Sequence, residues 1–207
     1  MIKESRAYRY CEYALQKGNR KVPVYVKKQC QLWKDIADGK SDEAYIDEKA
    51  YKKVKKILKL MVHPDLRVPM NEGISDYASL LITAIFCTKL VNENNIDIRY
   101  YNTALLEISR KNFKTFNSSV IFILLMLTEP RFSRFFSVAP DLKLSKELQL
   151  AIQKIIKSSP LLYDELNPAF KTLRSEVRCL LTDSEYTPLA YSQDKMDGEC
   201  SPAIAAM

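Results

Sequence analysis

The first part of the chain carries apolar residues at the three- and four-residue spacing that is typical of helices. The pattern predicts four helices, over 7–17, 24–37, 47–62 and 74–91. The last of these is apolar almost all round, so we expect it to be buried. A polar run over 92–95 then breaks the pattern. These observations predict an N-terminal helical region that covers residues 1–92.

The second part, over 93–207, changes character, because short β-type runs alternate with helical ones. The predicted strands cover 104–109, 134–139, 177–181, 187–191 and 203–207, and the predicted helices cover 116–128 and 145–158. The order strand, loop, helix, strand, helix predicts an α/β domain with a largely parallel sheet. The fold class that we predict is therefore an α/β domain preceded by a helical region.

A basic, polar loop joins the first predicted strand to the helix that follows it. A nucleoside triphosphate needs converging backbone N–H groups, a lysine that reaches the β/γ oxygens and a hydroxyl for Mg²⁺. Lys114 and Thr115 suit the last two roles, and the helix after them supplies the positive end of its dipole. We therefore predict an ATP and Mg²⁺ site, with the Thr115 hydroxyl on the metal. Its nucleotide-binding residues are Arg110, Lys111, Asn112, Phe113, Lys114 and Thr115.

The loop departs from the common phosphate-binding pattern G-x-x-x-x-G-K-[ST], which would place glycines at positions 108 and 113. Ile108 and Phe113 occupy these positions. Glycine before the lysine permits unusual backbone angles. Phe113 must therefore keep ordinary angles or carry strain. On the motif alone, a basic loop that binds no nucleotide is an open alternative.

Composition limits the classes of function that fit. The formal net charge is +7, which favours phosphate-rich partners. The five cysteines form no C-x-x-C pair, which argues against a zinc site and for reduced thiols. No signal peptide is visible, and the apolar run over 120–127 is too short to cross a bilayer as a helix. We therefore expect no membrane association.

Several segments resemble the large subunit of tailed-bacteriophage terminases, in the order in which that family carries them. The central segments cover 110–115, 128–140 and 189–198, and weaker likeness extends over 10–18 and 26–35. The resemblance implies a P-loop ATPase that drives DNA into a viral head, followed in the whole protein by a nuclease. It implies that Lys114 binds the β/γ-phosphates, that Thr115 ligates Mg²⁺ and that Arg110 stands at the head of the loop.

The same resemblance implies partners and a location. Double-stranded viral DNA, the portal protein and the terminase small subunit are the implied partners, and the implied assembly is a homo-oligomeric ring in the host bacterial cytoplasm. The strand over 203–207 falls where the family has its Walker B strand, and the sequence stops before the two acids that should follow. We therefore expect an incomplete P-loop domain over 93–207 that binds ATP but hydrolyses it negligibly.

Other candidate groups favour ordinary structural roles. Asp194, Asp197 and Glu199 surround a glycine, which favours solvated carboxylates in a turn over a metal site. The lysines over 49–59 ring an apolar stripe, which favours a solvated helix face over a DNA-binding one. His63 precedes a proline and is expected to end a helix. For the whole chain, a non-enzymatic basic module that binds DNA or a partner protein stays the alternative function.

Overall fold

The computed structural model describes residues 1–92, 97–109, 111–164 and 166–191, together with the backbone of 203–206. Contacts between residues divide the chain into two compact units. Unit 1 consists of Met1–Lys56 and Ile74–Leu106, and unit 2 of Ile57–Gly73 and Glu107–Met207. The predicted domains over 1–92 and 93–207 stay a prediction. Within the described residues, no helix combines the length and the apolar character that crossing a bilayer requires.

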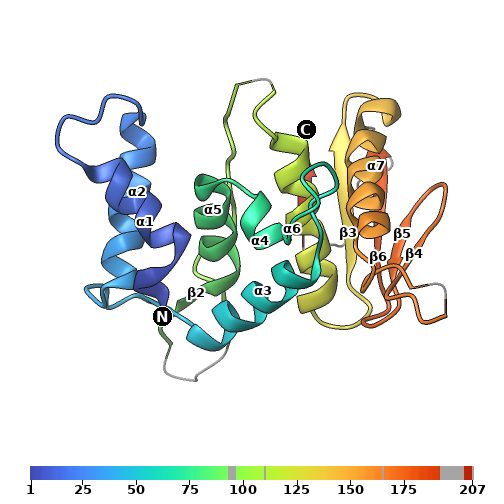
Figure 1. Cartoon of the computed structure of the whole chain (residues 1–207), viewed down its shortest axis with the longest axis horizontal. Helices are drawn as coiled ribbons and strands as arrows, with labels where there is room; N and C mark the ends of the chain where they lie inside the picture. Colours follow the sequence, from blue (N-terminus) through green and yellow to red (C-terminus); the bar gives the residue numbers. More distant parts are fainter. Residues whose placement is uncertain (93–96, 110, 165, 192–202, 207) are drawn as a thin grey trace. The chain divides into compact units, whose positions relative to one another are not determined.

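Unit 1 is mainly helical, as the sequence predicts (Figure 1). Its elements are η1 (Ile2–Glu4), α1 (Arg6–Leu15), α2 (Val24–Ala37), β1 (Ala44–Ile46), most of α3 (Glu48–Leu60), α5 (Asp76–Cys87) and β2 (Thr88–Leu90). Helix α1 packs against both α2 and α5. Trp33 of α2 is 1% exposed, and its indole Nε1 donates to Thr88 Oγ1 at 3.2 Å.

The predicted helix over 74–91 is partly wrong, because α5 ends at Cys87 and the chain continues as a strand. β2 pairs antiparallel with β1, so that Ala44 lies opposite Leu90. The backbone N–H of Asp47 also donates to the carbonyl of Cys87 at 2.8 Å. The pairing partner lies more than 40 residues upstream, so helical periodicity around residue 88 could not reveal the strand.

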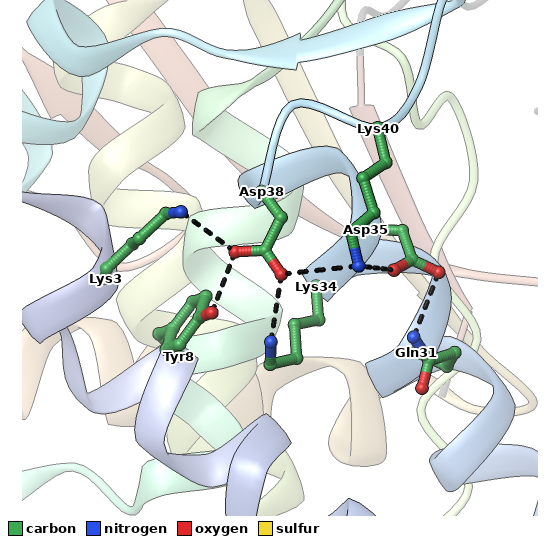
Figure 2. A network of polar contacts seen from close by, with 7 residues as sticks. All are labelled: Lys3, Tyr8, Gln31, Lys34, Asp35, Asp38 and Lys40. Atoms are coloured by element: carbon green, nitrogen blue, oxygen red, sulfur yellow. Dashed lines mark hydrogen bonds and ion pairs between the residues drawn. The ribbon is translucent and has the colours of Figure 1, made fainter.

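A cluster of charged and polar side chains joins η1, α1 and α2 around the Asp38 carboxylate (Figure 2). Its oxygens accept from Tyr8 OH at 2.8 Å and Lys34 Nζ at 2.9 Å, and Lys3 Nζ lies 3.1 Å away. The hydrogen bond from Lys34, followed by that from Tyr8, holds the pKa of Asp38 well below its ordinary value. Lys3 and Lys34 are therefore neutralised by the Asp38 carboxylate.

Unit 2 contains a five-stranded mixed sheet in the order β4-β5-β6-β3-β7. The strands are β3 (Arg134–Ala139), β4 (Phe170–Thr172), β5 (Val177–Cys179), β6 (Ser184–Ala190) and β7 (Ala203–Ala206). β3 pairs parallel with both β6 and β7, whereas β4, β5 and β6 form an antiparallel meander. The prediction of an α/β fold is confirmed, and the parallel character is confined to β6, β3 and β7.

Two long helices accompany this sheet, α6 (Lys114–Thr128) and α7 (Leu142–Ser158), which pack against each other (Figure 1). α7 also contacts β3 and β6. Both helices begin earlier than predicted, and α7 does so because the Asp141 carboxylate accepts from the Leu144 N–H at 2.8 Å. Between helix and sheet, Phe122 meets Phe135 and Tyr186 edge to face, with ring centroids 6.4 and 5.1 Å apart.

The predicted strand over 104–109 is wrong. Residues 103–109 take no regular secondary structure, and the Leu105 side chain is 88% exposed. An apolar run favours a strand only where a neighbouring strand pairs with it and a core covers one face. No strand pairs with the described residues of this segment, and Leu106 and Ile108 are only half-buried. The candidate loop therefore follows a segment without regular secondary structure.

His63 lies at the centre of the 57–73 segment of unit 2, which also contains α4 (Met70–Gly73). It is 5% exposed, and its Nδ1 accepts from the backbone N–H groups of Asp65 and Leu66 at 3.2 and 3.1 Å. The ring centroid lies 4.6 Å from that of Phe116 in the first turn of α6. Helix α3 ends at Leu60, so the predicted end at residue 62 is too late, and His63 lies in the turn after the helix. The same side chain also packs behind the start of α6.

Lowering the pH should weaken the fold through His63. Burial lowers the pKa of its imidazole, and an Nδ1 that accepts two N–H bonds must be unprotonated. The unfolded chain therefore binds a proton near pH 6.5 that the folded chain does not bind until lower pH. We expect the free energy of unfolding, measured by denaturant titration, to fall as the pH drops from about 7 through 6. His63→Asn keeps an acceptor at this position but cannot titrate, so a pH slope that persists in it contradicts the assignment.

Gly73 is constrained by the same ring. A Cβ at position 73 would lie 2.7 Å from His63 Cδ2 and 2.9 Å from its Cβ, so Gly73→Ala should cost about 1–3 kcal/mol of unfolding free energy. A double-mutant cycle with His63→Ala measures how much of the cost comes from this contact. The cost of Gly73→Ala should shrink markedly in the His63→Ala background. Additive effects would show that the imidazole ring atoms are not its cause, since His63→Ala keeps the Cβ.

Candidate phosphate-binding loop

The predicted site residues follow the irregular segment 103–109 and extend into the first turn of α6. Lys111, Asn112, Phe113 and Lys114 are exposed, and Thr115 is half-buried. Lys114 is the first residue of α6 and Thr115 the second. Arg110 lies outside the described residues. Five of the six predicted residues are therefore contiguous on one loop and helix start, which their sequence order already requires.

The backbone of this loop is left-handed at two residues that are not glycine. Lys111 has a φ of 65°, and Phe113 has a φ of 60° with a ψ of 25°. This conformation is rare for residues that carry a Cβ and costs about 1–2 kcal/mol. Phe113 occupies the position at which the phosphate-binding pattern has glycine, and it adopts a conformation that glycine adopts freely. The loop therefore has a glycine-like shape there without the glycine.

The N-terminus of α6 is open to an anion. Phe113 is the N-cap residue, and no side chain among the described residues caps the helix. The first helical hydrogen bond runs from the Asn117 N–H to the Phe113 carbonyl at 2.8 Å. In the same unit, by contrast, the Asp141 side chain caps α7. As far as the described residues show, no side-chain cap occupies the N–H groups at the positive dipole end of α6, which is where a helix binds phosphate.

The side chains beside this helix start fit a polyanion. Among the described residues, Lys111 and Lys114 form no ion pair, so neither ammonium group is neutralised by a carboxylate. Asn112 Nδ2 donates to Ser109 Oγ at 2.6 Å and to the Ser109 carbonyl at 3.3 Å, which closes the loop on itself. Lys111 and Lys114 therefore lie on a loop segment whose shape is stabilised by the hydrogen bonds between Asn112 and Ser109.

Phe116 and His63 contribute to this site, and no sequence pattern indicated either role. Phe116 packs edge to face on Phe113, with ring centroids 6.3 Å apart, and its ring centroid also lies 4.6 Å from that of His63. These contacts fix the start of α6 against the 57–73 segment. His63 lies some 50 positions upstream of the loop, and no local pattern links the two.

The described residues give little support for a metal site built from protein ligands alone. No group of three or more His, Cys, Asp or Glu side chains that could hold a metal ion occurs there. Asp194, Asp197 and Glu199 lie outside the described residues. The role of Thr115 as a Mg²⁺ ligand stays a prediction, as does that of ATP. The strand over 203–206 lies beside β3 and parallel to it, and its assignment as a Walker B strand stays a prediction.

Comparison with known proteins gives one informative match. No protein-family model matches the chain, and no curated protein matches it. Among solved structures, the fold is similar to the crystal structure of the HK97 bacteriophage large terminase, with a TM-score of 0.54 and 14% sequence identity. The match covers 75% of this chain and 36% of the terminase chain. The chain therefore has a terminase-like α/β fold and corresponds to about a third of that protein's length.

Strain at Phe113 predicts an unusual order of stability for two substitutions. Phe113→Gly and Phe113→Ala both remove the ring and its contact with Phe116, but only alanine keeps a Cβ in the left-handed conformation. We expect the glycine variant to be more stable than the alanine variant by about 1 kcal/mol in denaturant unfolding. At an ordinary helical position the order is the reverse. An alanine variant of equal or higher stability would show that position 113 is not left-handed.

Proposed function

We propose that this chain is the ATPase region of a phage terminase large subunit and that its loop at 111–115 binds ATP with Mg²⁺. The observation that carries the proposal is the left-handed backbone at Lys111 and Phe113, directly before Lys114 and Thr115 at the uncapped start of α6. This arrangement combines N–H groups, a lysine and a hydroxyl at one helix end, as a triphosphate requires. The terminase-like fold supports the same assignment.

The roles of the residues follow from their positions. The α6 N-terminus would receive phosphate oxygens through its N–H groups, and Lys114 would add a charge-assisted bond to the β/γ-phosphates. Thr115, one residue further along the helix, would present its hydroxyl to Mg²⁺. Arg110 and Lys111 would add positive charge beside the phosphates. The bound nucleotide supplies the phosphoryl group whose transfer drives such motors.

The wider proposal concerns the assembly. Terminase-like architecture supports a role in packaging double-stranded viral DNA, with the portal protein and a small terminase subunit as partners. The corresponding working form is a homo-oligomeric ring in the cytoplasm of the bacterial host. A basic module that docks DNA or a partner protein without nucleotide is the alternative, and the exposed Phe113 side chain, at 62%, is the feature that favours it.

Nucleotide titration tests the proposal directly. We expect the chain to bind ATP with Mg²⁺ in isothermal calorimetry, and Lys114→Ala to weaken binding at least tenfold, since a bond to a charged group contributes about 1.5–3 kcal/mol. Thr115→Ala should reduce the gain in affinity that Mg²⁺ provides.

Lys143→Ala is the matched control, because Lys143 is an exposed lysine in the first turn of the other long helix of unit 2. It should bind ATP as the unmodified chain does. Equal binding by the Lys114 and Lys143 variants, or no binding by the unmodified chain, would contradict the proposal and favour the module that uses no nucleotide.

A further inference from the structure

Helix α3 presents an exposed surface made of lysine. The lysine face, as we define it, consists of the α3 lysines that belong to unit 1: Lys49, Lys52, Lys53, Lys55 and Lys56. All five side chains are exposed, whereas Val54 and Leu58 on the same helix are 5% and 6% exposed. The helix therefore buries its apolar stripe, and over residues 48–56 its exposed side chains are all lysines.

The spacing of these residues concentrates their charge. At 100° per residue, the five Cα positions fall within an arc of about 160°, and at 1.5 Å per residue they extend over about 10 Å. Lys49, Lys52 and Lys56 follow one another three and four positions apart, so they form a row along the helix. Duplex DNA carries one phosphate charge per about 1.7 Å of its axis, so several phosphates lie within the reach of this row.

No carboxylate of the described residues compensates the charge of the lysine face. Among the described residues, none of the five lysines takes part in an ion pair. Glu48, the acidic residue of α3, accepts a hydrogen bond from the Ile2 N–H at 3.1 Å. The lysines around Asp38 differ, because Lys3 and Lys34 each lie within about 3 Å of its carboxylate (Figure 2).

We propose that the lysine face binds the phosphate backbone of duplex DNA without reading its sequence. Helix α3 has no Arg, Asn or Gln, the residue types that most often recognise base edges, so its contacts are limited to phosphates. The choice of DNA among polyanions rests on the proposed packaging function. The binding surface itself rests only on the charge and exposure of α3, and it is separate from the loop at 111–115.

Two other partners fit the face less well. A membrane-surface helix inserts an exposed apolar stripe into the lipid, but Val54 and Leu58 are buried. Single-stranded nucleic acid is usually held by exposed aromatic rings on which bases stack. Tyr51 is the aromatic residue of α3; it is half-buried, and Lys55 Nζ lies 5.9 Å from its ring centroid. Duplex phosphate is therefore the favoured ligand.

Salt-dependent binding tests the proposal. The probes are two fluorescent 30-base-pair duplexes of unrelated sequence, titrated with the whole chain between 50 and 300 mM KCl. The variant Lys52→Gln, Lys53→Gln, Lys56→Gln should bind both duplexes at least tenfold more weakly at low salt. Its slope of log K against log salt should be smaller by about two to three, because each lost phosphate contact removes about 0.9. Glutamine keeps the helix propensity of lysine, so melting should show an intact fold.

The matched control is the triple variant Lys143→Gln, Lys157→Gln, Lys171→Gln. It removes the same charge from exposed positions of α7 and β4, and it should bind DNA nearly as the unmodified chain does. Equal losses in the two triple variants would overturn the proposal, since net charge alone would then explain binding. Stronger binding to a single strand, to duplex RNA or to vesicles of anionic lipid would also overturn it.

Two further titrations separate this proposal from the proposed nucleotide site. The α3 triple variant should bind ATP normally, and Lys114→Ala should bind DNA normally. If the unmodified chain binds DNA but not ATP, the nucleotide proposal is contradicted and this proposal is not. Loss of DNA binding by Lys114→Ala would overturn the separation of the two sites, and this proposal with it.

Discussion

The packing of the His63 ring is the interaction on which the candidate site most depends. Its Nδ1 closes the turn after α3 by accepting two backbone N–H bonds, and its face meets Phe116 in the first turn of α6. On the other side, Gly73 leaves room for the ring. Nearby, the Val62 N–H donates to Ser159 Oγ at 2.9 Å, which ties the same segment to the end of α7. The start of α6 is thus stabilised by contacts with a segment that is remote in sequence.

That support explains how the loop can keep an unfavourable backbone. A left-handed phenylalanine persists only where its surroundings determine the conformation. Here the Phe113 carbonyl accepts the first helical bond of α6, and its ring rests on Phe116, which His63 holds in turn. Strain of this kind is common at binding sites, where a fixed loop shape lowers the entropy lost when a ligand binds.

The sequence predicted the helices well because each satisfies its own period. The range 24–37 matches α2, and the apolar stripe of α3 is buried as the spacing requires. The sequence-based predictions failed where strand pairing decides the structure. The strand β2 forms because β1 pairs with it, whereas residues 104–109 are strand-like in composition but have no described strand beside them. The loop residues could be proposed together because they are contiguous, and their binding role stays a prediction. His63 was assigned its turn but not its contact with Phe116, since only the folded chain brings them together.

The lysine face carries an energetic burden of its own. Its residues stand three and four positions apart, and each such pair of like charges disfavours the helix by about 0.2–0.5 kcal/mol at low salt. Helix α3 therefore forms because its apolar stripe is buried, against the repulsion on its outer side. Added salt relieves this repulsion while it weakens attraction to phosphate. A higher ionic strength should therefore stabilise helix α3 while it weakens the binding of DNA phosphates to the lysine face.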